Sequence, residues 1–207
     1  RDWSWSRGLG DVYKRQGNNK KIQIEFVSAN PTGPLHVGHG RGAAYGDAIG
    51  RILESTGSIV EKEYYVNDAG RQIDILTASI ILKLIKNDIG EYFPKNAYKG
   101  KYIEEITKKL DKKININMFK QLNENFSDDP EEEIDQVIKS LQELNNDSWN
   151  LIKSFSLKNI VKSIEDDLKL FNVNFDKWFY ESSLGVLENA SSDIASAINK
   201  LEKNGHA

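Results

Sequence analysis

The sequence predicts an α/β fold in which a βαβ unit with a parallel sheet precedes a largely helical segment. Three observations lead to this class. Apolar and polar residues alternate over residues 21–28, apolar residues recur at helical spacing over about residues 37–55, and residues 58–66 are β-branched and aromatic. Because strand, helix and strand follow in this order, the two strands are expected to be parallel, with a right-handed crossover between them.

The loop and the helix between these strands are marked by their own residues. Pro31, Gly33 and Pro34 disfavour regular structure, so a loop is expected over residues 29–35. The helix that follows is expected to end at Gly57. The residues predicted to face the core from this helix are Tyr45, Ala48, Ile49, Ile52 and Leu53.

Helical spacing dominates the chain beyond the second strand. A second helix is expected over residues 69–86, a long one over about residues 148–170, and a last one over about residues 187–201. Another helix is expected to begin at Pro130, since an Asp before it suits the N-cap and proline suits the first helical position. Residues 113–130 are polar and rich in asparagine, which predicts an exposed loop.

Composition sets limits on the class of protein. The 207 residues are 39% hydrophobic and 29% charged, with a net charge of -3, which is ordinary for a globular domain and gives no overall sign of a nucleic-acid-binding surface. The sequence has no cysteine, which excludes disulfides, thiolate metal sites and cysteine nucleophiles. It has no apolar run long enough to span a membrane and no secretory signal, so a cytoplasmic protein without membrane contact is expected.

The most informative segment is the junction between the first predicted strand and the first helix, which carries His36, Gly38, His39 and Gly40. Ligands of parallel sheets bind at the carboxyl ends of the strands, where helix N-termini offer N–H groups and a partial positive charge to phosphate. A glycine admits a flat base close to the backbone. Two histidines three residues apart project to the same side of a helix start, where they can donate hydrogen bonds to phosphate oxygens as charge develops.

Other interpretations fit the same residues. The two histidines could be metal ligands, although no third ligand lies nearby in the sequence, or they could be ordinary surface residues. Gly38, Gly40 and Ala43 match a dinucleotide fingerprint, but that motif directly follows a strand, and here about nine residues, including two prolines, intervene.

Residues 35–39 are similar to the HIGH signature of class I aminoacyl-tRNA synthetases, although other nucleotidyltransferases share the bare HxGH pattern. The longer stretches 25–43 and 65–73 resemble the arginyl-tRNA synthetase form. Residues 98–103 and the segment 175–184 also resemble the bacterial-type enzyme. The resemblance covers roughly residues 20–207.

This resemblance implies an arginine–tRNA ligase, which joins L-arginine and ATP to give arginyl-adenylate and pyrophosphate, and then transfers the arginine to tRNA(Arg). His36 and His39 are the implied catalytic residues. The implied ATP-binding residues are His36, Gly38, His39 and Gly40. The implied amino-acid-binding residues are Glu25, Ser28, Ala29, Asn30 and His39.

Asp47, Asn67, Asp68 and Gln72 are candidates for positioning these residues through hydrogen bonds. Asp47 could instead accept a hydrogen bond on the helix surface, Asn67 and Asp68 could cap the second helix, and Gln72 could face water. ATP is expected as a substrate together with Mg²⁺, with no structural metal. The partners that the resemblance implies are L-arginine, ATP and tRNA(Arg), and the protein is expected to be a monomer.

The sequence departs from the family pattern, since no lysine-rich KMSK-like motif, which completes the ATP site, is found in it. The N-terminal tRNA-contacting domain, the later part of the Rossmann fold and the C-terminal helical anticodon-binding domain of the family are also not seen. We therefore expect a truncated, partial Rossmann-like (HUP-type) fold that is inactive alone. Residues 1–16 are expected to be a non-native or disordered leader, 17–90 the first half of the Rossmann-like catalytic domain, and 91–207 a helical insertion and continuation of it. The alternatives are a non-catalytic nucleotide-binding module and another HxGH nucleotidyltransferase.

Overall fold

The computed structural model describes residues 16–89, 92–110, 114, 116–122, 125–185, 189 and 191–206. The predicted leader, apart from its last residue, lies outside the described residues. The chain divides into two compact units. We call them the sheet unit, made of Arg1–Asn30, Leu35–Asn67 and Glu165–Ala207, and the helical unit, made of Pro31–Pro34 and Asp68–Ile164.

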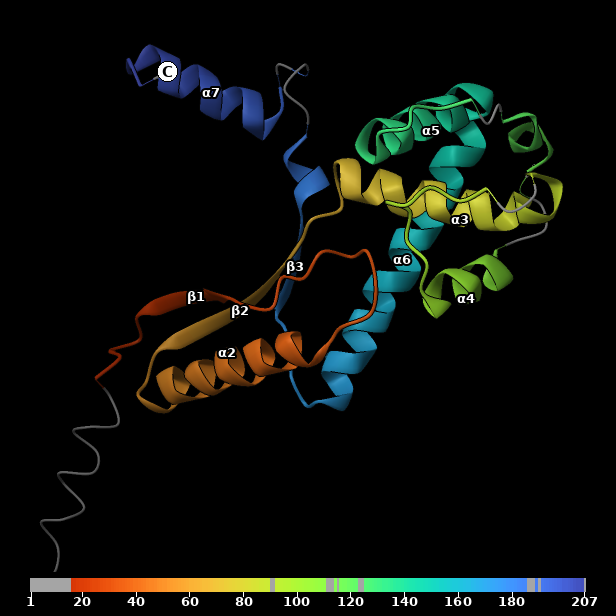
Figure 1. Ribbon diagram of the computed structural model, residues 1–207. Helices are drawn as coiled ribbons and strands as arrows, with labels where there is room; N and C mark the ends of the chain where they lie inside the picture. Colours follow the sequence, from red (N-terminus) through yellow and green to blue (C-terminus); the bar gives the residue numbers. More distant parts are fainter. Residues whose placement is uncertain are drawn as a thin grey trace, which may run out of the picture. The chain divides into compact units, whose positions relative to one another are not determined.

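The sheet unit contains a parallel sheet of three strands in the order β1-β2-β3 (Figure 1). Strand β1 is Lys21–Glu25, β2 is Ile59–Val66 and β3 is Lys177–Tyr180. The register places Lys21 opposite Ile59 and Glu63 opposite Lys177. The predicted parallel pairing of the first two strands is confirmed. The third strand was not predicted from the sequence, and the first strand ends three residues earlier than expected.

Helix α2, Val37–Ser55, connects β1 to β2 and lies along the sheet (Figure 1). The face predicted for its core contact is wrong, because Tyr45 is 72% and Ile52 is 62% exposed. The buried positions of α2 are Ala43, Gly46, Asp47 and Gly50. A Cβ added at Gly46 would collide with the Phe26 ring, and one at Gly50 would lie 2.7 Å from Cε of Lys62. The helix therefore approaches the sheet too closely for large side chains.

Aromatic rings fill the space beside the sheet. The rings of Phe26 and Phe175 lie 4.5 Å apart, and those of Tyr64 and Trp178 stack at 4.4 Å. The edge of the Phe175 ring meets Tyr64 at 5.3 Å. Such pairs contribute about 0.5–1.5 kcal/mol each beyond the area that they bury. Because Phe175 and Trp178 come from the end of the chain, this cluster attaches β3 to the βαβ unit.

The helical unit is built around α3, Arg71–Ile89, α4, Lys101–Lys109, and α5, Pro130–Leu144. Helix α6, Asn146–Leu170, belongs to this unit up to Ile164. Asp129 is the N-cap of α5, as predicted, and accepts hydrogen bonds from the backbone N–H groups of Glu131 and Glu132. The fully buried side chains of this core include Ile73, Leu76, Ile80, Ile81, Leu82, Ile85, Ile134, Leu141 and Trp149.

Helix α3 begins two residues later than predicted, after Gly70, whose φ of +83° favours glycine. It belongs to the helical unit. The domain boundaries expected from the sequence, after residues 16 and 90, stay a prediction. The asparagine-rich segment is not wholly a loop, since it contains the short helix η1, Asn117–Gln121, with Phe119 fully buried.

After α6 the sheet unit continues through β3 into η2, Glu181–Leu184, and α7, Asp193–Lys203. Ser192 is the N-cap of α7, and its hydroxyl accepts a hydrogen bond from the backbone N–H of Ala195. Leu187, expected in this helix, lies outside the described residues. Among the described helices, none is long and apolar enough to cross a membrane.

Candidate functional site

The start of α2 holds the two histidines of the predicted site. His36 is the N-cap and His39 the third helical residue of α2. The two side chains form a capping box, in which each accepts hydrogen bonds from backbone N–H groups of the first turn. Nδ1 of His36 accepts from the N–H of Gly38 at 3.1 Å, and Nδ1 of His39 accepts from the N–H of His36 at 3.2 Å. The two rings stack with centroids 3.7 Å apart. The expectation that both histidines project to the same side is confirmed.

This double cap fixes the tautomer that each ring has in its neutral form. A neutral imidazole that accepts a hydrogen bond at Nδ1 carries its proton at Nε2. Both histidines therefore present an Nε2–H donor when neutral. Partial burial, and next the neighbouring His36, lower the pKa of His39 from its ordinary 6.5, which favours the neutral form.

The cap also uses most of the N–H groups expected to receive a phosphate. The N–H groups of His39 and Gly40 both donate to the carbonyl of His36, at 2.9 and 3.2 Å. Within the described part of the chain, Val37 alone keeps a first-turn N–H without a partner. A phosphate at this helix start would therefore depend chiefly on the imidazole Nε2–H donors.

The two glycines of the motif differ in what they do. A Cβ at Gly38 would lie 2.9 Å from Cε1 of His36, so this glycine makes room for the folded-back ring of the N-cap histidine. A Cβ at Gly40 would meet nothing within 4 Å. Open space at Gly40 is what the close approach of a flat ligand requires.

The loop after β1 has an unusual backbone. Val27 and Ser28 have φ values of 65° and 39°, in the left-handed region that β-branched residues such as Val27 rarely adopt. The N–H of Ser28 donates to the carbonyl of Phe26 at 2.9 Å, and the Ser28 hydroxyl accepts from the N–H of Tyr65 at 3.1 Å. Such conformations cost about 1–3 kcal/mol each and cluster at functional sites.

Tyr64 holds this loop and was missed by the sequence reasoning. Its buried hydroxyl accepts from the N–H of Ala29 and donates to the carbonyl of Ala29, both at 3.0 Å. Burial raises the pKa of Tyr64 to about 12, against the effect of the bond with Ala29. Both backbone groups of Ala29 are thus occupied, which fixes the backbone of the loop at this residue. The signal was an aromatic residue inside a strand that ends beside the motif.

The other predicted amino-acid-binding residues lie at the two ends of this loop. Glu25 is exposed at the end of β1, and Asn30 is exposed at the end of the loop. Ser28 is half-buried and Ala29 is buried between them. The predicted set is therefore contiguous in the sheet unit, on the segment that leads from β1.

The side chain of Asp47 bonds two cations. Its carboxylate bonds Nζ of Lys62 at 2.8 Å through one oxygen and the guanidinium of Arg51 through the other. Burial alone would raise the pKa of Asp47, but these two cations outweigh it and lower the pKa. The side chain thus attaches α2 to β2, a role that the sequence left undecided.

The remaining supporting residues divide between the units. Asn67 is the last residue of the sheet unit's second segment, whereas Asp68 and Gln72 belong to the helical unit. Arg71, beside Gln72, pairs with Glu131 at 2.6 Å and with Asp135 at 2.7 Å, so it connects α3 to α5. Among the described residues, no three acidic or histidine side chains gather closely enough to hold a metal ion.

The fold and the first turn of α2 together define a class. A parallel sheet, a histidine pair at the N-terminus of the first crossover helix and a preceding strained loop are those of a class I aminoacyl-tRNA synthetase catalytic domain. A family model described as "tRNA synthetases class I (R), catalytic domain" matches residues 8–207. The chain belongs to this family, and the resemblance noted in the sequence is confirmed. The match begins inside the segment expected to be a leader.

Curated relatives agree with the family. The arginine–tRNA ligase of Acinetobacter baylyi is 40% identical over 211 residues, which cover 90% of this chain and 34% of the relative. That of Thioalkalivibrio sulfidiphilus is 41% identical and covers 97% of this chain and 36% of the relative. The chain therefore spans about a third of the length of these relatives.

Solved structures agree with the fold. A structure described as an arginyl-tRNA synthetase of Campylobacter jejuni superposes with a TM-score of 0.62 and 26% identity, over 97% of this chain and 38% of that one. The arginyl-tRNA synthetase of Thermus thermophilus superposes with a TM-score of 0.52 and 24% identity, over 89% of this chain and 26% of that one, which supports the fold alone.

Proposed function

We propose that this chain supplies part of the active site of an arginine–tRNA ligase, which activates L-arginine with ATP and transfers it to tRNA(Arg). The observation that carries the proposal is the stacked, mutually capping pair of His36 and His39 in a chain of this family. The pair offers two Nε2–H donors at a helix N-terminus, a place that suits a phosphate group.

In the first step, a carboxylate oxygen of arginine attacks the α-phosphorus of ATP, and the bond to pyrophosphate breaks. Negative charge grows on the phosphate oxygens during this step. The Nε2–H groups of His36 and His39 would donate to these oxygens, and neither ring need lose its proton. Preorganised donors of this kind contribute about 10²–10³-fold to a rate.

The loop after β1 would hold the amino acid. In the continuous stretch of Ser28, Ala29 and Asn30, the Tyr64 hydroxyl bonds both backbone groups of Ala29, and the N–H of Tyr65 donates to the Ser28 hydroxyl. A rigid loop positions a ligand without an ordering cost at the moment of reaction. Glu25, the last residue of β1, would attract the α-ammonium group or the guanidinium of arginine.

Gly40 would admit the flat part of ATP, since no atom stands where a side chain would begin. Mg²⁺ would arrive with ATP, held by phosphate oxygens and water, because this ion commonly keeps several waters and binds through substrate phosphates. The protein that carries this chain would act in the cytoplasm as a monomer. The 207 residues alone would be inactive, since the lysine-rich partner motif is not among them.

The test is ATP–pyrophosphate exchange by the full-length protein that carries this chain, with tRNA present and each amino acid in turn. Of the amino acids tested, only arginine should support exchange. His39→Ala should lower the exchange rate about 100-fold or more, whereas Val37→Ala, at a 92% exposed position of the same turn, should change it little. Exchange with another amino acid would contradict the arginine assignment, and exchange with none would favour a non-catalytic module.

A further inference from the structure

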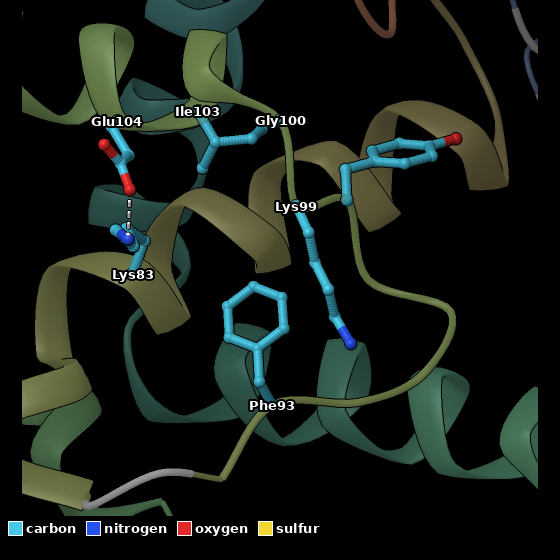
Figure 2. Close-up of a pocket in the computed structure, with 7 residues that line it drawn as sticks. Lys83, Phe93, Lys99, Gly100, Ile103 and Glu104 are labelled. Atoms are coloured by element: carbon cyan, nitrogen blue, oxygen red, sulfur yellow. Dashed lines mark hydrogen bonds and ion pairs between the residues drawn. The ribbon is translucent and has the colours of Figure 1, made fainter.

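The helical unit contains a cavity of about 250 Å³ that the proposed chemistry does not use (Figure 2). Phe93, Tyr98 and Ile103 give it apolar surface, and Lys83, Lys99 and Glu104 give it charge. Ile103 is buried, and the two aromatic rings are half-buried. All of these residues belong to one unit, and they lie on α3, on α4 and on the segment between them.

The charged residues that line the cavity include one more lysine than acidic residues. Nζ of Lys83 is paired with Glu104 at 2.7 Å (Figure 2). Lys99 has no ion pair with a described residue, and its ammonium lies 5.5 Å from the centre of the Phe93 ring. Two lysines and one glutamate give a net charge of +1 in the cavity, which matches the single negative charge of a phosphodiester.

The sequence around the cavity is also positively charged and aromatic. Residues 92–110 contain five lysines and two glutamates, a local charge of +3 in a chain whose total is -3. Aromatic residues are interleaved with these lysines, at Tyr92, Phe93, Tyr98 and Tyr102. Cations that follow a backbone, with aromatic faces on which bases stack, are the means by which proteins bind single-stranded nucleic acid.

We propose that this cavity binds one nucleotide of single-stranded RNA, with the base stacked on Phe93 and the adjacent phosphodiester at Lys99. The ammonium that now lies over the Phe93 ring would move from the ring to the phosphate, so that the base takes its place. The volume of about 250 Å³ lies just below the range of about 300–1,000 Å³ for pockets of drug-sized ligands, so the cavity has room for no more than one nucleotide. This proposal rests on the proposed function only for the identity of the RNA, which would be the tRNA substrate.

The test is an NMR titration of the 207-residue chain with a four-nucleotide uridine RNA, which reports both the affinity and the amides that respond. Shifts should centre on residues 93 and 98–104. Phe93→Leu keeps an apolar side chain but removes the stacking face, and should weaken binding roughly tenfold. Lys99→Ala should weaken binding severalfold and lower the salt dependence by about the contribution of one phosphate contact.

Lys101→Ala is the matched control, because this exposed lysine at the start of α4 carries the same charge but does not line the cavity. It should change the affinity less than about twofold. Equal losses for Lys99→Ala and Lys101→Ala would overturn the proposal in favour of unspecific charge attraction. Unchanged binding by Phe93→Leu, or binding of uridine monophosphate but not of the RNA, would also overturn it.

A second pair of measurements separates this proposal from the proposed function. His39→Ala should lower exchange by the full-length protein about 100-fold or more and leave RNA binding by this chain unchanged. If wild-type exchange is not found but the Lys99 and Phe93 variants still weaken RNA binding, the cavity proposal stands without the ligase. If exchange is found but the RNA shifts no amide of the cavity, the cavity proposal fails and the ligase stands.

Discussion

Helices α2 and α3 have the same length of 19 residues, yet they are held in opposite ways. Helix α2 buries small or charged positions, Ala43, Gly46, Asp47 and Gly50, and exposes Val37, Tyr45 and Ile52. Helix α3 buries large aliphatic side chains in succession, among them Leu76 and Ile80. The helix that carries the histidines therefore depends on a close fit and an ion pair, and the other depends on buried apolar area.

This difference indicates where each unit is vulnerable. Loss of apolar volume should weaken the helical unit most, whereas added volume or a lost polar contact should weaken the sheet unit most. Hydrogen exchange of backbone amides, read separately for the two units, distinguishes these outcomes because it measures local as well as global opening.

The largest effect is expected from Leu76→Ala in α3. Leu76 is fully buried, so its truncation leaves a cavity and should cost about 3–5 kcal/mol in the free energy of unfolding of the helical unit. Faster exchange should appear in α3 and α5. The matched control is Leu170→Ala, at a position 87% exposed, which should cost less than about 0.5 kcal/mol. Similar losses for the two variants would contradict the apolar core described for α3.

Gly46→Ala should give the next largest effect, in the sheet unit. The added methyl group would collide with the Phe26 ring, so α2 must move from the sheet at a cost of about 1–3 kcal/mol. Gly42→Ala is the control one helical turn earlier, where an added Cβ meets nothing within 4 Å. It should stabilise α2 by about 0.5–1 kcal/mol, because alanine favours a helix more than glycine does. A change in the free energy of unfolding with the same sign for the two substitutions would disprove the close contact at Gly46.

Most of the fold of the βαβ unit was predictable because its signals are local. Alternation marked β1, aromatic and β-branched residues marked β2, and the histidine motif marked the start of α2. The core face of α2 was not predictable, since periodicity assigns large apolar residues to a core, and Gly46 and Gly50 pack only because Phe26 and Lys62 lie opposite them.

Strand β3 and the role of Tyr64 depend on contacts between residues far apart in sequence. Trp178 packs on Tyr64, which lies more than a hundred residues earlier, and no local pattern indicates that pairing. Likewise the strand tyrosine at position 64 gave no indication that its hydroxyl binds both backbone groups of Ala29. The motif located the candidate site, whereas the groups that hold it in place needed the structure.

Tyr64→Phe should give the third effect, in the loop after β1. The substitution keeps the ring but leaves the N–H and the carbonyl of the buried Ala29 without their partner, at a cost of about 1–3 kcal/mol. Exchange of the Ala29 amide should accelerate more than that of the amides in β2. Tyr45→Phe, at a 72% exposed ring, should change neither measurement. Unchanged protection of Ala29 in Tyr64→Phe would show that the hydroxyl does not hold the loop.

The smallest effect is expected from pH, through the cap of α2. The pKa of folded His39 lies below its ordinary 6.5, so the folded state binds fewer protons than the unfolded state as the pH falls through this range. The cap should therefore contribute fully above about pH 6.5 and be lost as the pH falls through the folded pKa. Because a whole helix cap contributes typically about 1 kcal/mol, the loss should stay below that.

His39→Gln tests whether the titration of this ring is the cause. A glutamine at the third helical position can accept the same hydrogen bond from the N–H of residue 36, as in other capping boxes, but it does not titrate. At pH 7.5 the variant should unfold in urea with the same free energy of unfolding of the sheet unit as the wild type. Between pH 7.5 and 5.5 this free energy should decrease in the wild type but not in the variant. If the fall persists in His39→Gln, another group causes it, and the neutral Nε2–H form of His39 would no longer be supported by stability.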